Sequence, residues 1–149
     1  MDFKQFAKLM EQRADNIVKN ANNVKKQVAT VLVETLAYTT PVDEGVAVSN
    51  WLVGVNEPRT ETIPAHNPGV SRSTRPENIR ATIGNAKAII DTVMPGDVVH
   101  VSNSVPYIFD LNRGTSGQAP NGMTKQSIAK AKTIIKGAKL LGKPNGRST

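Results

Sequence analysis

The chain has 149 residues, of which 38% are hydrophobic and 4% aromatic, and its formal net charge is +7 at pH 7. This length fits one domain that buries about two-thirds of its unfolded surface, in a core built mainly of aliphatic side chains. The chain has no cysteine, which excludes disulfides and thiolate chemistry. No apolar run approaches the ~20 residues of a membrane span, and the N-terminal segment is too charged for a signal peptide. We therefore expect a protein made in the cytoplasm, with no membrane partner.

Residues 2–39 form the longest uninterrupted pattern in the sequence. Apolar side chains recur near helical spacing without glycine or proline, and Asp2 can cap the first turn. This predicts one helix from Asp2 to about Thr39, which at 1.5 Å per residue spans on the order of 55 Å. The Val28–Leu36 end is the most apolar and should pack on the sheet. The more polar Lys4–Asn23 part either kinks, or projects and packs on another subunit, or is an ordinary amphipathic helix with a frayed start.

Residues 40–56 turn the chain and then alternate in polarity. Proline at position 41 disfavours helical geometry at Thr40, and Gly45 is free to take positive φ in the turn that follows. The alternation from Val46 to Asn56 predicts a strand of about ten residues. Trp51, the only tryptophan, is expected in the core of the domain.

The middle of the chain, residues 57–76, is rich in proline and predicted to be irregular. Connections of this length are unusual inside a compact domain and are usually functional or disordered. His66 and His100 are the only histidines. Because there is no cysteine and no carboxylate at metal-ligand spacing, we expect no metal site.

A second strand is predicted to open at Val98, from the alternation over residues 98–102. Two strands do not make a stable sheet alone. Further strands are therefore expected from Glu61–Val70 or Tyr107–Leu111, and failing that a neighbouring subunit must supply the pairing.

Two more helices are predicted from apolar spacing. The first runs to Met94 from a cap at residue 73 or 74. The last runs from Met123 or Thr124 to Leu141, and residues 142–149 are expected to be disordered. The last helix is expected to pack five side chains inward, those of Ile128, Ala131, Ile134, Ile135 and Ala138.

The fold class that follows is α+β: a long N-terminal helix and one or two further helices packed on a small antiparallel sheet, with long Pro/Gly-rich loops. A single domain spans residues 1–141. It divides into the long helix (1–39), a core with loops (40–123) and a basic helix (124–141).

Positive charge gathers after Asp110, the last acidic residue. A basic segment of this kind indicates either a solvated face or a polyanion nearby. The lysines that would face DNA in the second case are Lys125, Lys130, Lys132, Lys136 and Lys139.

No pattern in the sequence indicates catalysis. The nucleophile elbow, the phosphate-cradling loop, the His-Glu-x-x-His motif and the dinucleotide fingerprint are all absent from it. Asp43 and Glu44 are adjacent, so their side chains diverge rather than form an acid/base pair. We expect no enzyme, no catalytic residue and no cofactor.

Two blocks of residues carry a resemblance to a known family. The first is Thr40-Pro41-Val42-Asp43-Glu44-Gly45 with Ser49-Asn50-Trp51; the second is Ser102-Asn103-Ser104-Val105-Pro106-Tyr107 with Leu111-Asn112-Arg113-Gly114-Thr115-Ser116 and Gln118-Ala119-Pro120-Asn121-Gly122-Met123. Both resemble elements of the tail-completion (neck) proteins of tailed bacteriophages, in a span covering residues 40–123. The chain departs from the family pattern at Val46 and Val48, where small or basic residues are usual, and at Thr124-Lys125, which replaces an apolar-acidic pair.

The resemblance implies a structural virion protein that joins the head connector to the tail. Such a protein would form a homo-oligomeric ring of six or twelve copies around the DNA channel, in the neck or tail of the virion after assembly in the host cytoplasm. Its partners would be adjacent neck, tail-terminator or tail-tube proteins, and phage DNA in the lumen without sequence specificity. The residues we expect at its interfaces are Pro106, Tyr107, Arg113, Thr115, Gln118, Pro120 and Met123.

Two alternatives remain open at the level of sequence. One is a free-standing nonspecific DNA-binding protein, which the basic C-terminal helix favours. The other is a phage enzyme or inhibitor acting on the host, which would need a discrete concave site. Within the family, the sequence does not separate tail completion from the tail-terminator and head-stopper roles.

Overall fold

The computed structural model describes residues 1–114, 117 and 122–141, and its fold is mixed α+β, as predicted. The predicted disordered segment, 142–149, lies outside the described residues. The elements in chain order are α1 (Phe3–Thr39), α2 (Val46–Ser49), β1 (Leu52–Val55), α3 (Arg75–Ile90), β2 (Val99–Ser102), α4 (Ile108–Asn112) and α5 (Thr124–Lys136).

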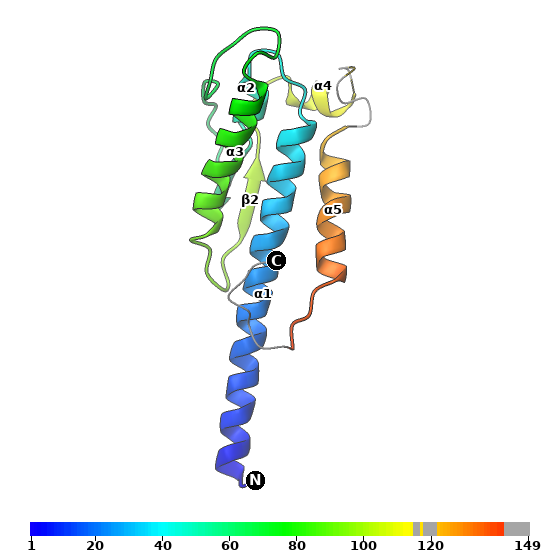
Figure 1. Ribbon diagram of the computed structural model, residues 1–149. Coiled ribbons are helices and arrows are strands. Elements are labelled where there is room, and N and C mark those ends of the chain that lie inside the picture. Colours follow the sequence, from blue (N-terminus) through cyan, green and yellow to red (C-terminus); the bar gives the residue numbers. More distant parts are fainter. Residues whose placement is uncertain (115–116, 118–121, 142–149) are drawn as a thin grey trace.

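Helix α1 is the longest element, and the other elements pack along its inner half. It begins in a capping box, in which the Asp2 carboxylate accepts from the Gln5 N–H at 2.8 Å and the Gln5 side chain accepts from the Asp2 N–H at 3.0 Å. Its inner half lies between α3 and the sheet on one side and α5 on the other, and its outer half extends beyond the body (Figure 1). The predicted long helix is therefore confirmed, and the Lys4–Asn23 part projects from the body without a kink (Figure 1); its packing on another subunit stays a prediction. We call residues 3–21 the arm.

Strands β1 and β2 form an antiparallel sheet in which Leu52 pairs with Ser102 and Val55 with Val99. Within the described residues the sheet has these two strands alone, so the further strands expected at 61–70 and 107–111 are wrong. Helices replace the missing strands, because side chains of α1 and α3 cover the sheet in one apolar cluster with β1. The buried members of that cluster are Ala29, Val33, Val53, Ala86 and Ile90.

The predicted strand from Val46 is wrong in its first half, which is helix α2. Gly45 has φ of +91° and starts the short helix, and Asn50 closes it by donating from Nδ2 to the Val46 carbonyl at 2.8 Å. Alternating apolar residues are typical of a strand, but a short helix that is buried on several sides can have the same sequence pattern. The prediction for Trp51 is confirmed, because this side chain is 7% exposed and lies in the core.

Helices α3 and α5 are where the sequence predicts helices, but both end early. Helix α3 ends at Ile90 rather than Met94, and α5 ends at Lys136, with Gly137 as its C-cap. Of the α5 side chains expected to pack inward, Ala131 is buried, whereas Ile128 and Ile135 are 49% and 57% exposed. Inward packing of these two isoleucines is therefore wrong, because α5 lies against one helix and buries only a narrow face.

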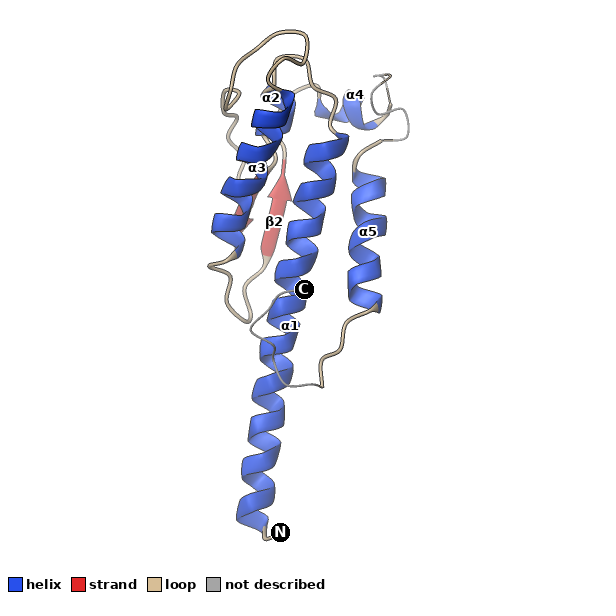
Figure 2. Cartoon of the chain, viewed as in Figure 1, coloured by secondary structure: helices blue, strands red, loops and turns tan. Residues whose placement is uncertain are grey.

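The end of the molecule opposite the arm is formed by α2, the 57–74 connection and α4, and we call it the apex (Figure 2). One apolar cluster joins the top of α1 to this end and to the start of α5. Its buried members are Leu36, Trp51, Val105, Ile108 and Met123. The apex is thus closed by residues that lie far apart in the sequence.

Candidate functional site

The first of the two sequence blocks, within residues 40–51, forms a buried polar connection at the apex. The Trp51 indole N–H donates to Thr40 Oγ1 at 2.7 Å, and the Thr40 hydroxyl donates to the Leu36 carbonyl at 2.5 Å. Trp51 is thereby tied to the last turn of α1. The polar atom of a large buried side chain is satisfied, which removes the cost of its desolvation.

Asn50 holds the long connection against α2. Its Oδ1 accepts from the Ile63 N–H at 2.7 Å, and its Nδ2 donates to the Ile63 carbonyl at 2.8 Å. The side-chain amide therefore binds one residue of the connection as a strand neighbour would.

Asn78, on α3, is the centre of a second polar group at the apex. Its Oδ1 accepts from Ser49 Oγ at 3.1 Å and from the Asn67 N–H at 2.9 Å, while its Nδ2 donates to the carbonyls of Asn67 and Thr74. A Cβ at Gly45 would lie 2.4 Å from Asn78 Nδ2, so this position requires glycine for space as well as for its positive φ. Sequence reasoning missed Asn78, although an asparagine amid the apolar stripe of a helix was a signal for a buried polar role.

Asp43 fixes the far end of the same connection. Its carboxylate accepts from the Ser71 N–H at 3.0 Å, and its carbonyl accepts from the Arg72 N–H at 3.0 Å. Ser71 and Arg72 both have positive φ, a conformation that these bonds help to hold.

The second sequence block connects α4 to α5. Asn112 Oδ1 accepts from the backbone N–H groups of Met123 and Thr124, both at 3.0 Å, and so caps α5 from outside the helix. A Cβ at Gly122, where φ is +79°, would lie 2.6 Å from the Asn112 carbonyl oxygen. Asn103 donates to the Ala47 carbonyl at 2.9 Å and joins the block to α2.

A groove of about 310 Å³ opens at the apex between α2 and α4. It is lined by residues 41–47 together with Tyr107 and Leu111. The pKa of Tyr107 is raised by partial burial and by the nearby Glu44 carboxylate. The carboxylates of Asp43 and Glu44 and the apolar side chains of Val42, Val46 and Leu111 line the groove.

The structure separates the predicted interface residues into three groups. Pro106 and Arg113 are exposed and Tyr107 is 45% exposed, so these three lie on the surface of the apex. Met123 is fully buried in the cluster that includes Ile108 of α4. The prediction that Met123 contacts a partner is therefore wrong. Thr115, Gln118 and Pro120 lie outside the described residues.

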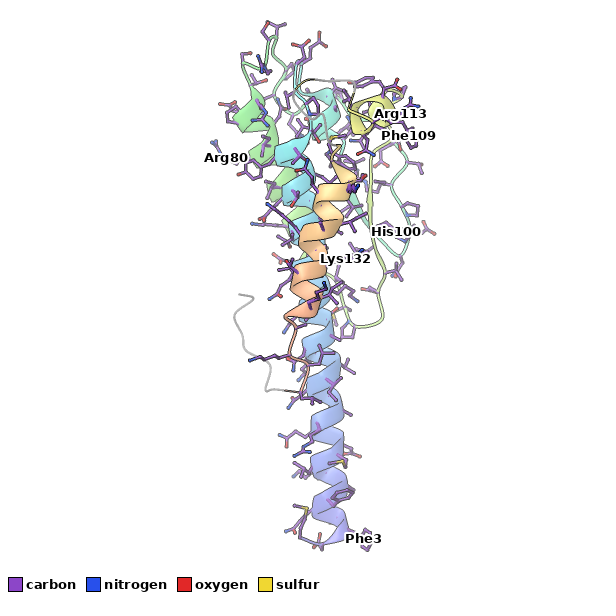
Figure 3. All side chains as sticks on the ribbon, turned by 90° about the vertical axis from the view of Figure 1, so that its right-hand side faces the viewer. Phe3, Arg80, His100, Phe109, Arg113 and Lys132 are labelled. Atoms are coloured by element: carbon purple, nitrogen blue, oxygen red, sulfur yellow. The ribbon has the colours of Figure 1, made fainter. Side chains whose placement is uncertain are left out.

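Phe109 was missed as a surface residue of the apex. Its side chain is 77% exposed beside Arg113, which forms an ion pair with Asp110 on the same short helix (Figure 3). The apolar run that includes Phe109 suggested a strand, in which this ring would have faced the core.

The predicted DNA-facing lysines share one property: all are exposed on α5 or directly after it. Figure 3 views α5 from its outer side, with Lys132 on that face. None of the ion pairs found among the described residues includes one of them. The five are Lys125, Lys130, Lys132, Lys136 and Lys139.

The arm carries the second surface of interest. Phe3 is 93% exposed, Phe6 50%, Met10 37% and Val18 49%. These side chains lie on a helix that no other described element covers, far from the apex (Figures 1 and 3).

The histidines do not form a metal centre in the described part of the chain. His66 and His100 lie on the 57–74 connection and on β2, and no group of three metal-binding side chains is found among residues 1–114, 117 and 122–141. Partial burial lowers the pKa of His66. In the same residues no helix combines the length and the apolar character that crossing a membrane requires.

Comparison of the chain with family models, with curated proteins and with solved structures gives no match.

Proposed function

We propose that this chain is a structural subunit of a tailed bacteriophage, a ring-forming tail-completion (neck) component that joins the head connector to the tail around the DNA channel. The resemblance of residues 40–123 to that family provides the role, and the surfaces of the molecule provide physical support. The protein has no catalytic part in this account.

The observation that carries the proposal is the arm. A helix that extends beyond the body with Phe3, Phe6 and Met10 uncovered is an unfavourable surface for an isolated monomer, because exposed apolar area gains free energy when a partner covers it. A subunit of an assembly meets such partners at every contact with a neighbour.

The apex supports the same function in a different way. The side chains of Asn50, Asn78 and Asn112 hydrogen-bond to loop backbone and to the start of α5. These bonds hold the part of the fold that carries the surface residues Pro106, Tyr107 and Phe109. A rigidly held apolar surface with an acidic groove suits docking to an adjacent ring.

The lysines of α5 support a position facing DNA. They are exposed without a carboxylate partner among the described residues, so phosphate groups would meet no internal competitor. Each lysine that engages a phosphate would steepen the dependence of log affinity on log salt by about 0.9.

Quantitative mass spectrometry of density-purified particles tests the proposal. The chain is expected at about six or twelve copies per particle, as a symmetric ring requires. Absence of the chain from particles would overturn the structural role.

A second candidate function, free-standing nonspecific DNA binding, is favoured by the same uncompensated lysines. It predicts tight, salt-sensitive binding of duplex DNA by the isolated protein, whereas the neck proposal predicts weak binding before assembly. Replacing Lys130, Lys132 and Lys136 with glutamine should then reduce the salt slope, while replacing Lys4 and Lys8 on the arm serves as the matched control. Tight binding in the isolated protein would favour the second candidate.

A further inference from the structure

Small and large apolar residues alternate along one face of α1 at spacings of four and three. On the arm the positions are Phe3, Ala7, Met10, Ala14, Ile17 and Ala21. The series continues on the inner half of the helix with Val24, Val28, Val31 and Thr35. Spacings of four and three residues keep all these side chains on one stripe, which we call the α1 seam.

The inner half of the α1 seam is already a helix-pairing surface. Val31 and Ile134 line one groove, and Ser127 and Ala131, which share a face of α5 with Ile134, are buried. Helix α5 runs antiparallel to α1 along this side (Figure 1). Its small residues at the contact allow the two helices to approach closely.

The outer half of the α1 seam has no such cover. Helix α5 ends at Lys136, and the chain that follows it touches the arm at Asn20, whose side chain donates to the Leu140 carbonyl at 2.7 Å. Further out, Phe3, Ala7, Met10 and Ala14 are exposed, whereas Ile17 is half-buried; Ala21, next to Asn20, is exposed.

The order of residue sizes identifies what fits this surface. If a second arm lies antiparallel, with the centre of the pairing near residue 12, Phe3 faces Ala21, Met10 faces Ala14 and Ile17 faces Ala7 of the other copy. Every large side chain then meets a small one, which is how close-packed interfaces are filled. In a parallel pair in register, large residues would meet large ones and alanines would meet alanines.

We propose that two copies of this chain pair through the outer halves of their α1 seams, as an antiparallel helix pair. The pairing continues the interface that α5 makes with the inner half of the same seam. It leaves the apex and the lysines of α5 uncovered, and it does not depend on the phage role. Neighbouring copies in a ring of six or twelve differ by a rotation too small to turn their arms antiparallel, so the antiparallel pair belongs to the unassembled protein.

Disulfide trapping tests the pairing and its direction, since the chain has no cysteine of its own. Met10→Cys and Ala14→Cys are prepared separately and then oxidised alone and as a mixture. The mixture should form a covalent dimer of the two variants, because residues 10 and 14 face each other, while each variant alone should remain uncrosslinked, because its cysteines lie too far apart for a disulfide. Gln12→Cys, on the opposite face of the arm, is the control for random collision. Crosslinking of Met10→Cys alone as fast as in the mixture, or a mixture that does not exceed the Gln12→Cys control, would overturn the proposal.

The mass in solution gives an independent test. Sedimentation equilibrium should show a species of twice 16.0 kDa. Ala14→Glu should raise the dissociation constant of the dimer by roughly 100-fold or more, because it puts a charge in the middle of an apolar contact. Gln12→Glu, with the same charge change two residues away, should leave the dissociation constant unchanged. A dimer that tolerates Ala14→Glu, or a wild-type chain that sediments as a monomer, would contradict the pairing. Either outcome leaves the number of copies in particles to be judged separately.

Discussion

The apex and the arm differ in the contacts that stabilise them. At the apex, residues far apart in sequence meet, and side chains such as Asn78 and Trp51 have their polar atoms satisfied in the interior. On the arm, the stabilising features within the described chain are helix propensity, the capping box at Asp2 and, at its inner end, the hydrogen bond from Asn20 to the Leu140 carbonyl. Most helical stability in proteins comes from tertiary packing, which the outer turns of the arm lack within this chain. The contacts of the apex thus lie within one chain, whereas the arm leaves apolar side chains exposed for the second copy that we propose.

The largest difference between the two regions should appear when one aromatic side chain is removed from each. Trp51→Ala should lower the free energy of unfolding by about 3–5 kcal/mol, because it leaves a cavity in the core and removes the partner of Thr40. Phe3→Ala should change it little at concentrations where the protein is monomeric, since this ring is 93% exposed. Urea denaturation measures both. A similar loss for the two variants would mean that the arm is packed within its own chain.

The next effect concerns the buried asparagine of the apex. Asn78→Ala should cost about 2 kcal/mol, because Ser49 Oγ and the backbone of Asn67 lose their partner. It should also release the 57–74 connection, which limited proteolysis would detect as new cleavage in that segment. Asn85→Ala, on an exposed position of the same helix, is the matched control. Unchanged proteolysis in Asn78→Ala would show that the connection is held by other contacts.

A smaller effect is expected where α5 is capped. Asn112→Ala should cost about 1 kcal/mol, since the N–H groups of Met123 and Thr124 lose their acceptor. Asn112→Asp keeps the acceptor oxygen and adds negative charge at a helix N-terminus, so it should retain the stability of the wild type. Thermal denaturation compares the three proteins. An alanine variant as stable as the aspartate variant would contradict a capping role.

The smallest effect should be the pH dependence of the turn before β2. Hydrogen bonds from the Met94 N–H and from Asn56 lower the pKa of Asp97, and the charge of Lys25 acts in the same direction. Because the pKa is lowered on folding, the ionised carboxylate stabilises the fold above the unfolded pKa of about 3.9, and this contribution is lost as the pH falls through the folded pKa. Asp97→Asn should therefore be less stable than the wild type at pH 7, with the difference shrinking in acid. A difference that is the same at pH 7 and at pH 3 would rule out ionisation as its cause.

The elements with strong local signals were the ones that the sequence could predict. The unbroken spacing of α1 and the cap at Asp2 gave the long helix, and the alternation over residues 98–102 gave β2. Helix α2 was predicted as a strand because the contacts that hold it as a helix are not visible in its own sequence pattern. The Asn50 side chain donates to the Val46 carbonyl, and Ser49 donates to Asn78 of α3. No local pattern shows which distant residues cover a short apolar run.

The sequence predicted which regions carry the candidate surfaces, but not which individual residues are exposed on them. Charge alone placed the lysines on an exposed face of the last helix, and the projecting arm was among the predicted alternatives for Lys4–Asn23. Met123 was taken for a surface residue because it follows a Gly/Pro-rich loop, but the cap made by Asn112 turns it inward. Which isoleucines of α5 are covered depends on how it lies against α1, which periodicity alone does not determine.

Amide hydrogen exchange along α1, measured over a range of protein concentrations, tests most directly whether the arm is completed by another molecule. Amides of residues 24–39 should be protected at every concentration, while those of residues 7–21 should exchange rapidly in dilute protein and become protected as the concentration rises. Protection of the arm that does not change with concentration, whether high or absent throughout, would contradict the proposed pairing.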